Sequence, residues 1–317
     1  MVWLSAALGF ALLILAGDSL VKGAVNLSLR LGIPALIVSL TVVAFGTSAP
    51  ELIIAINAVI EGVPSLALGN IVGSNTANIL LVLGLPAIFA TLDSSEHDTK
   101  KAYLAMMVAT CLFIGLAFLG VFVWQSGLIL LVLLVYILGD TLRDAQRHSD
   151  ERTENTDINP SLTLEAKPQM HWWKIAIYLT LGIIGLPLGA HILVESASHI
   201  ARLFGVSEAI IGLTLVALGT SLPELATTIT AALRRQADVA LGNVIGSNMF
   251  NLLTIMGLST LVGTVPVDNT FLTFDLWVML SASLLLIPFV FFKWNITRRF
   301  GLGLTALYLF YVTLVVM

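Results

Sequence analysis

The chain has 317 residues, of which 58% are hydrophobic and only 11% charged, and its formal net charge is −4. A soluble domain carries about 25% charged residues, so this composition excludes a protein whose whole surface faces water. Lipid tolerates only helices or closed barrels, and the sequence lacks the series of alternating ten-residue strand segments that a barrel requires. We therefore predict an all-α integral membrane protein.

Ten apolar segments, bounded by charged residues, Pro or Gly, are predicted to cross the membrane as helices. In chain order they cover residues 2–21, 33–60, 64–90, 101–121, 125–142, 174–197, 208–232, 238–262, 272–292 and 300–316. The first segment has no basic region before it, so we expect a retained helix and not a cleaved signal. Cys111 is the single cysteine, which rules out a disulfide within the chain.

Basic residues predict the orientation of these helices. If the loops alternate from an outer N-terminus, 14 of the 15 Lys and Arg residues lie on the inner side, and only Arg202 lies outside. Positive charge marks cytoplasmic loops, so both termini are expected outside the cell membrane, which is the inner membrane in a bacterium. The polar stretch 143–171 is then a cytoplasmic linker, too short for a folded domain. It separates two units, residues 1–142 and 172–317.

These two units contain an internal repeat. Residues 40–85 align with 213–258 at a constant offset of 173 without a gap, and 23 of the 46 positions are identical. The copies share GTSxPEL, at 46–52 and 219–225, and ALGNxxGSN, at 67–75 and 240–248. Five predicted spans per unit is an odd number, so the second unit must have the opposite orientation in the membrane. We therefore predict two inverted-topology repeats, an architecture that places transported ions near the membrane midplane.

Each copy places a glutamate, Glu51 or Glu224, inside an apolar span that contains no Lys or Arg. A carboxylate at a helix centre costs about 2.5–3.5 kcal/mol on insertion scales. Small residues in the motif are explained by close helix packing alone, but the two glutamates are not. A bound cation would compensate both charges, and the sequence therefore predicts a cation site.

Neutral oxygen donors accompany both glutamates. They are Thr47, Ser48, Ser74 and Asn78 in the first copy and Thr220, Ser221, Ser247 and Asn251 in the second. Hard cations such as Na⁺ and Ca²⁺ prefer oxygen ligands, and neither motif holds a Cys or His for zinc or copper. Pro50 and Pro223 lack an N–H and are expected to break their helices. For the flanking Asn70, Asn75, Asn243 and Asn248, ion contact and a purely structural role remain open.

Charge predicts how such a site would work. Two carboxylates give a cavity charge near −2, which one Ca²⁺ or two Na⁺ would neutralise. An empty, doubly charged cavity is costly to carry through a dry intermediate, so mutually exclusive occupancy favours exchange. Outside the motifs, Asp18 and Lys22 are predicted to pair on one helix face, and the repeat offset places His191 and Glu195 at the equivalent positions.

The doubled GTSxPE and GNxxGSN motifs resemble the two repeats of the cation/Ca²⁺ exchanger superfamily, which includes the sodium/calcium exchangers; the short linker is similar to bacterial and archaeal members. The resemblance implies ten helices, sliding of the first and sixth helices, and Na⁺/Ca²⁺ antiport. It implies ion ligands at the twelve positions Ala44, Thr47, Ser48, Glu51, Ser74, Asn78, Ala217, Thr220, Ser221, Glu224, Ser247 and Asn251, the two alanines through their carbonyls. Some branches carry Asp where this chain has Asn78 or Asn251, so the sodium stoichiometry stays open.

Three other functions could use parts of this sequence. A H⁺/Ca²⁺ antiporter is the nearest rival, since a desolvated Glu could carry a proton. A cation channel could use the same oxygens but would place them around an axial pore. An intramembrane aspartyl protease would need two facing Asp residues, and Asp18 and Asp140 lie at helix ends. We expect no enzyme activity, no cofactor and no nucleic-acid partner, with Na⁺ and Ca²⁺ as substrates and a single chain sufficient for transport.

Overall fold

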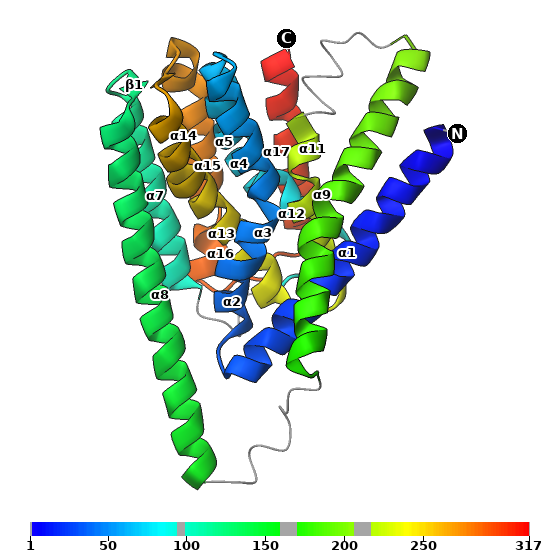
Figure 1. Cartoon of the computed structure of the whole chain (residues 1–317), viewed down its shortest axis with the longest axis vertical. Helices are drawn as coiled ribbons and strands as arrows, with labels where there is room; N and C mark the ends of the chain where they lie inside the picture. Colours follow the sequence, from blue (N-terminus) through cyan, green and yellow to red (C-terminus); the bar gives the residue numbers. More distant parts are fainter. Residues whose placement is uncertain (1, 94–98, 159–169, 206–216, 317) are drawn as a thin grey trace.

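The computed structural model describes residues 2–93, 99–158, 170–205 and 217–316, which form a bundle of helices (Figure 1). The first half contains α1 (Val2–Leu31), α2 (Ala35–Val38), the π-helical turn η1 (Ser39–Val43), α3 (Ala44–Thr47), α4 (Ala49–Ile60), α5 (Pro64–Ala77), the π-helical turn η2 (Asn78–Val82), α6 (Gly84–Phe89), α7 (Lys100–Ala117), β1 (Val121–Phe122) and α8 (Trp124–Ile158). The second half contains α9 (Trp172–Leu203), α11 (Ala217–Thr220), α12 (Leu222–Leu233), α13 (Ala237–Phe250), the π-helical turn η5 (Asn251–Ile255), α14 (Met256–Val262), β2 (Val265–Pro266), the π-helical turn η6 (Phe271–Asp275), α15 (Leu276–Leu284), α16 (Ile287–Phe291) and α17 (Arg298–Val316). The strands β1 and β2 pair antiparallel and join the two halves at one end of the bundle.

The described residues include seven helices that are long and apolar enough to cross a membrane, or eight if a bent pair counts as one span. This pair is Ala35–Thr47 with Ala49–Ile60, and its halves meet at 44°. The fold is therefore that of a multi-pass membrane protein, as predicted from composition. Ten spans remain a prediction, and the expected span 208–232 lies partly outside the described residues.

Helices α1, α8 and α9 extend well past their predicted ends, and α9 continues past residue 197 to Leu203. α1 continues past residue 21 to Leu31 and ends where Gly32 adopts a left-handed conformation, with φ of 72°. α8 continues past residue 142 to Ile158, so the first half of the expected linker is helical. Residues 143–158 contain neither Pro nor Gly, and nothing in the sequence breaks the helix before Pro160. The rest of the expected linker, up to residue 169, lies outside the described residues.

The sequence repeat is also a repeat of secondary structure. The bounds of α4, α5 and η2 in the first half match those of α12, α13 and η5 in the second half at the same offset of 173. Ser48 and Ser221, which precede α4 and α12, share a non-helical backbone with φ of −86° and ψ near zero. The two copies of the motif therefore break their helices at equivalent residues.

The two long helices α1 and α9 lie side by side along one flank of the bundle (Figure 1). Small residues allow this approach: a Cβ on Gly189 of α9 would lie 2.9 Å from the Leu13 nitrogen of α1. Leu13, Leu20 and Leu186 belong to a separate apolar cluster, distinct from the main core around α5 and α13. The α1–α9 pair is thus a layer of its own against the core helices, and α1 also packs on α12.

Candidate cation site

The broken helices place the two glutamates at helix starts. Ser48 and Ser221 occupy the break, and Pro50 and Pro223 lie within the first two positions of α4 and α12. Glu51 and Glu224 follow in the first turn. The N-terminus of a helix carries partial positive charge, which favours an anion at this position even in a buried setting.

Both glutamates are buried, each with 1% of its surface exposed. The two repeat copies bring them close together, because Ser48, three residues before Glu51, contacts the Glu224 carboxylate. The surrounding predicted residues are buried as well, namely Ala44, Thr47, Ser48, Ser74, Asn78, Thr220, Ser221, Ser247 and Asn251. Ala217 begins α11, and only its backbone is described.

Contacts between the halves join several of the predicted residues. The Ser48 hydroxyl donates to Oε1 of Glu224 at 3.1 Å. Thr47 Oγ1 lies 3.4 Å from Ser247 Oγ, so hydroxyls from both repeats meet here. Asn78 Nδ2 donates to Oδ1 of Asn248 at 3.1 Å. Residues of the first repeat therefore meet residues of the second around a single centre.

Several oxygens at this centre have no hydrogen-bond donor within the described part of the chain. They are Oε2 of Glu51, Oε2 of Glu224, Oδ1 of Asn78 and Oδ1 of Asn251, and each is buried. A buried polar atom without a partner costs about 1–3 kcal/mol, and more when it is charged. All four are acceptors, two of them on carboxylates, so a cation and not a further acceptor would satisfy them.

The π-helical turns place the two asparagines at this centre. η2 begins at Asn78 and η5 begins at Asn251, each directly after a regular α-helix. A π-helical turn shifts the side chains that follow it relative to an ideal helix, and such turns are frequent at functional sites. Nothing in the sequence predicted these turns. The motif spacing predicted the two asparagines as site residues, but it did not predict the π-helical turns that begin at them.

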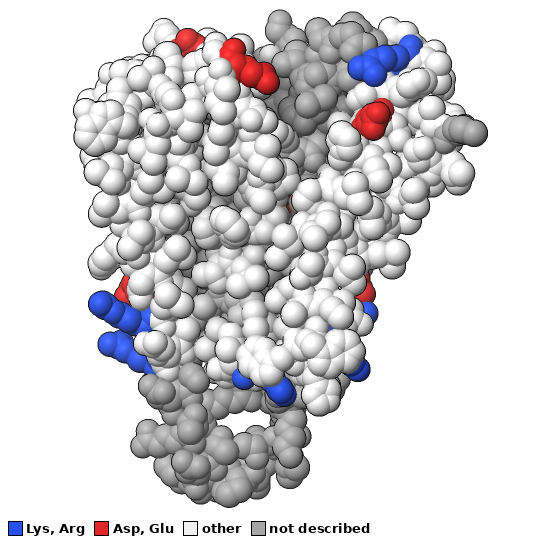
Figure 2. Space-filling view, in the orientation of Figure 1, with Lys and Arg blue, Asp and Glu red and all other residues white. Residues whose placement is uncertain are grey.

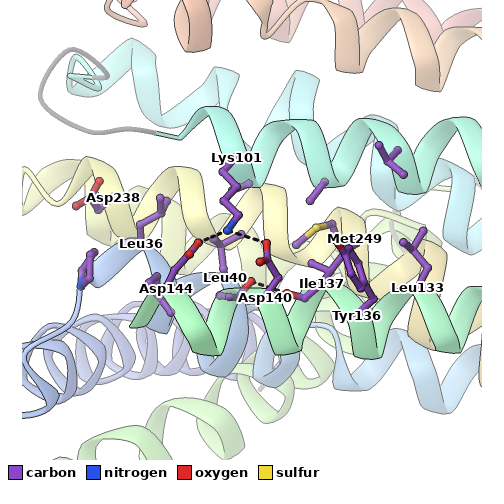
Figure 3. A pocket seen from close by; sticks show the side chains of 16 residues that line it. Leu36, Leu40, Lys101, Leu133, Tyr136, Ile137, Asp140, Asp144, Asp238 and Met249 are labelled. Atoms are coloured by element: carbon purple, nitrogen blue, oxygen red, sulfur yellow. Dashed lines mark hydrogen bonds and ion pairs between the residues drawn. The ribbon is translucent and has the colours of Figure 1, made fainter. Parts of the chain in front are cut away.

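One cavity adjoins the cluster, and a larger one lies apart from it. One of about 210 Å³ separates α9 from α4 and α12 and is lined by Pro50, Thr220, Pro223 and His191. It therefore reaches residues of the predicted site from one side. A larger cavity of about 490 Å³ lies between α2, α7, α8 and α13 (Figure 3). Lys101 bridges Asp140, at 2.7 Å, and Asp144 at the edge of this cavity, which contains none of the predicted ligands.

Comparison with known proteins gives a consistent result over the whole chain. The family model described as "Sodium/calcium exchanger protein" matches residues 1–141 and 174–317. CaxA of Alkalimonas amylolytica is 35% identical over 88% of this chain and 86% of its own length. The sodium/calcium exchanger MaX1 of Methanosarcina acetivorans is 31% identical over 98% and 96%.

A solved structure of the sodium-calcium exchanger NCX_Mj, soaked with Na⁺ and Sr²⁺, superimposes on this chain with a TM-score of 0.79. Its sequence is 31% identical, and the match covers 98% of this chain and 96% of that one. The similarity thus extends to the arrangement of the helices, the two repeat copies included.

Proposed function

Because this chain belongs to the sodium/calcium exchanger family, we propose that it is a secondary active antiporter that exchanges Na⁺ for Ca²⁺ across the cell membrane. Members of this family are transporters and not enzymes. The observation that carries the proposal is the buried cluster of oxygens at Glu51 and Glu224. It combines two carboxylates with acceptors that lack donors, and it is assembled from both repeat copies. The ligand set that we propose comprises the twelve predicted residues.

Alternating access would follow from the layered arrangement. We assign ten spans in two inverted repeats, with both termini outside and the 143–171 segment in the cytoplasm. The distribution of charge supports this orientation, because most basic side chains visible in Figure 2 gather at the end of the molecule that carries the long extension of α8. The α1–α9 layer would slide against the core and expose the cluster to one side at a time.

Transport measurements in proteoliposomes test this function. We expect uptake of radiolabelled Ca²⁺ to require an opposing Na⁺ gradient, and neither a K⁺ nor a proton gradient should replace it. The reason is that Ser48, which contacts Glu224, and the neighbouring Thr47 and Ser247 provide hydroxyl oxygens, and hydroxyls suit Na⁺ as ligands. Uptake driven by protons alone would favour the H⁺/Ca²⁺ antiporter, and flux without any counter-ion gradient would favour a channel.

An ion pair fixes α1 to the core in this conformation. Asp18 of α1 accepts from Nε of Arg234 at 2.5 Å, where Arg234 ends α12, and also pairs with Lys22 at 2.7 Å. The cavity at His191 lies on α9, at the position that the repeat offset makes equivalent to Asp18. We therefore expect the Asp18–Arg234 pair to hold one end of the pathway closed while the other is accessible.

Replacing Asp18 by Asn is expected to populate the opposite state. The groups are partly exposed, so the pair contributes about 1 kcal/mol at most, a shift of up to about fivefold. The measurement is the labelling rate of His191→Cys by an impermeant maleimide, with Cys111 replaced by Ser. Labelling should slow in Asp18→Asn and recover in the charge swap Asp18→Arg with Arg234→Asp. An unchanged rate in Asp18→Asn would show that the pair does not control access.

A further inference from the structure

The asparagine of the GNxxGSN motif in the second repeat, Asn243 of α13, makes contacts that the ligand set does not explain. It is fully buried, and its side chain lies between α3 and α12. Nδ2 lies 3.3 Å from the carbonyl oxygen of Glu224 and 3.2 Å from Oγ1 of Thr228. A carbonyl can only accept, so the amide nitrogen must face α12 and the amide oxygen must face the opposite way.

On that opposite side, Oδ1 of Asn243 lies 3.2 Å from the hydroxyl oxygen of Thr47. Thr47 has one proton to donate, and its neighbouring acceptors are Asn243 Oδ1 at 3.2 Å, the Ala44 carbonyl at 3.2 Å and the Ser247 hydroxyl at 3.4 Å. If Thr47 donates to the Ala44 carbonyl or to Ser247, it occupies a lone pair of an oxygen in the proposed ligand set. If it donates to Asn243, the oxygens of Thr47, Ala44 and Ser247 all remain available.

We propose that Asn243 is a positioning residue, which accepts the hydrogen bond of the Thr47 hydroxyl and so leaves the oxygens of Thr47, Ala44 and Ser247 free to face the cation. It touches no ion itself, and it acts through a threonine that belongs to the other repeat. The inference rests on the proposed function, because it presupposes a cation at Glu224. It also decides between the two roles that the sequence left open for this asparagine.

The first repeat contains a similar arrangement of hydrogen bonds with fewer contacts. Oδ1 of Asn70 accepts from the hydroxyl of Thr220, at 3.4 Å, so that each asparagine serves the threonine of the other repeat. Asn70 Nδ2, however, has no hydrogen-bond partner in the described part of the chain. The residue equivalent to Thr228 at the offset of 173 is Ala55, which has no hydroxyl to accept from it. The Asn70 amide is therefore held from one side only, and we expect a smaller effect from its loss.

A double-mutant cycle on Ca²⁺ binding tests the proposal, with the full chain purified in detergent. Asn243→Ala should weaken Ca²⁺ binding about fivefold to tenfold, the effect of one buried hydrogen bond. In a Thr47→Val background the same substitution should change binding by less than about twofold, because the hydroxyl that it positions is absent. The exposed Asn57→Ala on α4 is the control and should leave binding unchanged.

A purely structural Asn243 would weaken binding by the same factor with or without the Thr47 hydroxyl, and that result would overturn the proposal. If Asn243→Ala does not fold, the same cycle is measured with Asn70→Ala and Thr220→Val. We expect a smaller coupling between these two substitutions, and purely additive effects on Ca²⁺ binding would overturn the proposal. A wild-type chain that binds Ca²⁺ but does not exchange it for Na⁺ would refute the antiport function, and the mutant cycle on Ca²⁺ binding would still test the role of Asn243. A wild-type chain that does not bind Ca²⁺ would refute both.

Discussion

Sodium-driven Ca²⁺ uptake is expected to fall at least about 100-fold when either Glu51 or Glu224 is replaced by Gln. Removing one partner of a buried ion pair costs about 3–5 kcal/mol, which corresponds to a loss of more than two orders of magnitude. Both side chains are 1% exposed, so water cannot replace the lost charge. Gln keeps the size of the side chain, and the effect therefore reports the charge. The measurement is the initial rate of radiolabelled Ca²⁺ uptake in proteoliposomes.

Thermal unfolding separates loss of the site from loss of the fold. Without cations, each Gln variant should melt at or above the wild-type temperature, because one of two buried carboxylates has been removed. Adding Ca²⁺ should raise the melting temperature of the wild type, since a ligand stabilises the state that it binds, but should have little effect on the variants. Glu61→Gln, at the exposed end of α4, is the matched control. Uptake at the wild-type rate in either site variant would contradict the assignment of the cation site.

The structure buries the predicted site residues together, whereas it differs from the predicted helix ends. Glu51 and Glu224 were singled out because a carboxylate in an apolar span is energetically costly unless a partner compensates its charge. The repeated motif then identified the hydroxyl residues next to each glutamate. Helix ends were missed at Leu31 and Ile158, because charged residues mark the membrane boundary but do not stop a helix. The π-helical turns at Asn78 and Asn251 were also missed, since they depend on tertiary packing that no local pattern records.

The partners of the flanking asparagines could not be derived for a related reason. Asn243 of α13 bonds to Thr47 in α3 and to Thr228 in α12, and Thr47 is 196 positions away from it. The repeat makes Asn70 and Asn243 look equivalent, yet Ala55 stands where the second copy has Thr228. The two motif copies are identical at these asparagines, but their hydrogen-bond partners differ, and this difference is seen only in the structure.

Replacing Gly246 by Ala is expected to disrupt the site, because Gly246 packs against the segment that contains Ala44. A Cβ at this position of α13 would lie 2.6 Å from the Ala44 Cβ and 2.6 Å from the Leu40 carbonyl oxygen. Leu40 belongs to η1 and Ala44 to α3, so α13 would push away the segment that carries the Ala44 carbonyl and Thr47. Overpacking of this kind costs about 1–3 kcal/mol. We expect a lower melting temperature in detergent, and also weaker Ca²⁺ binding in the protein that remains folded.

Gly115→Ala on α7 is the matched control, because Gly115 is exposed and its added Cβ would meet nothing within 4 Å among the described residues. It should match the wild type in both measurements. In Gly246→Ala the two losses should appear together, since the contact that strains the fold lies against the segment that holds the proposed ligands. A Gly246→Ala protein that melts early but binds Ca²⁺ with wild-type affinity would show that the positions of Ala44 and Thr47 do not control the site. The ligand set would then have to rest on the ten other proposed residues.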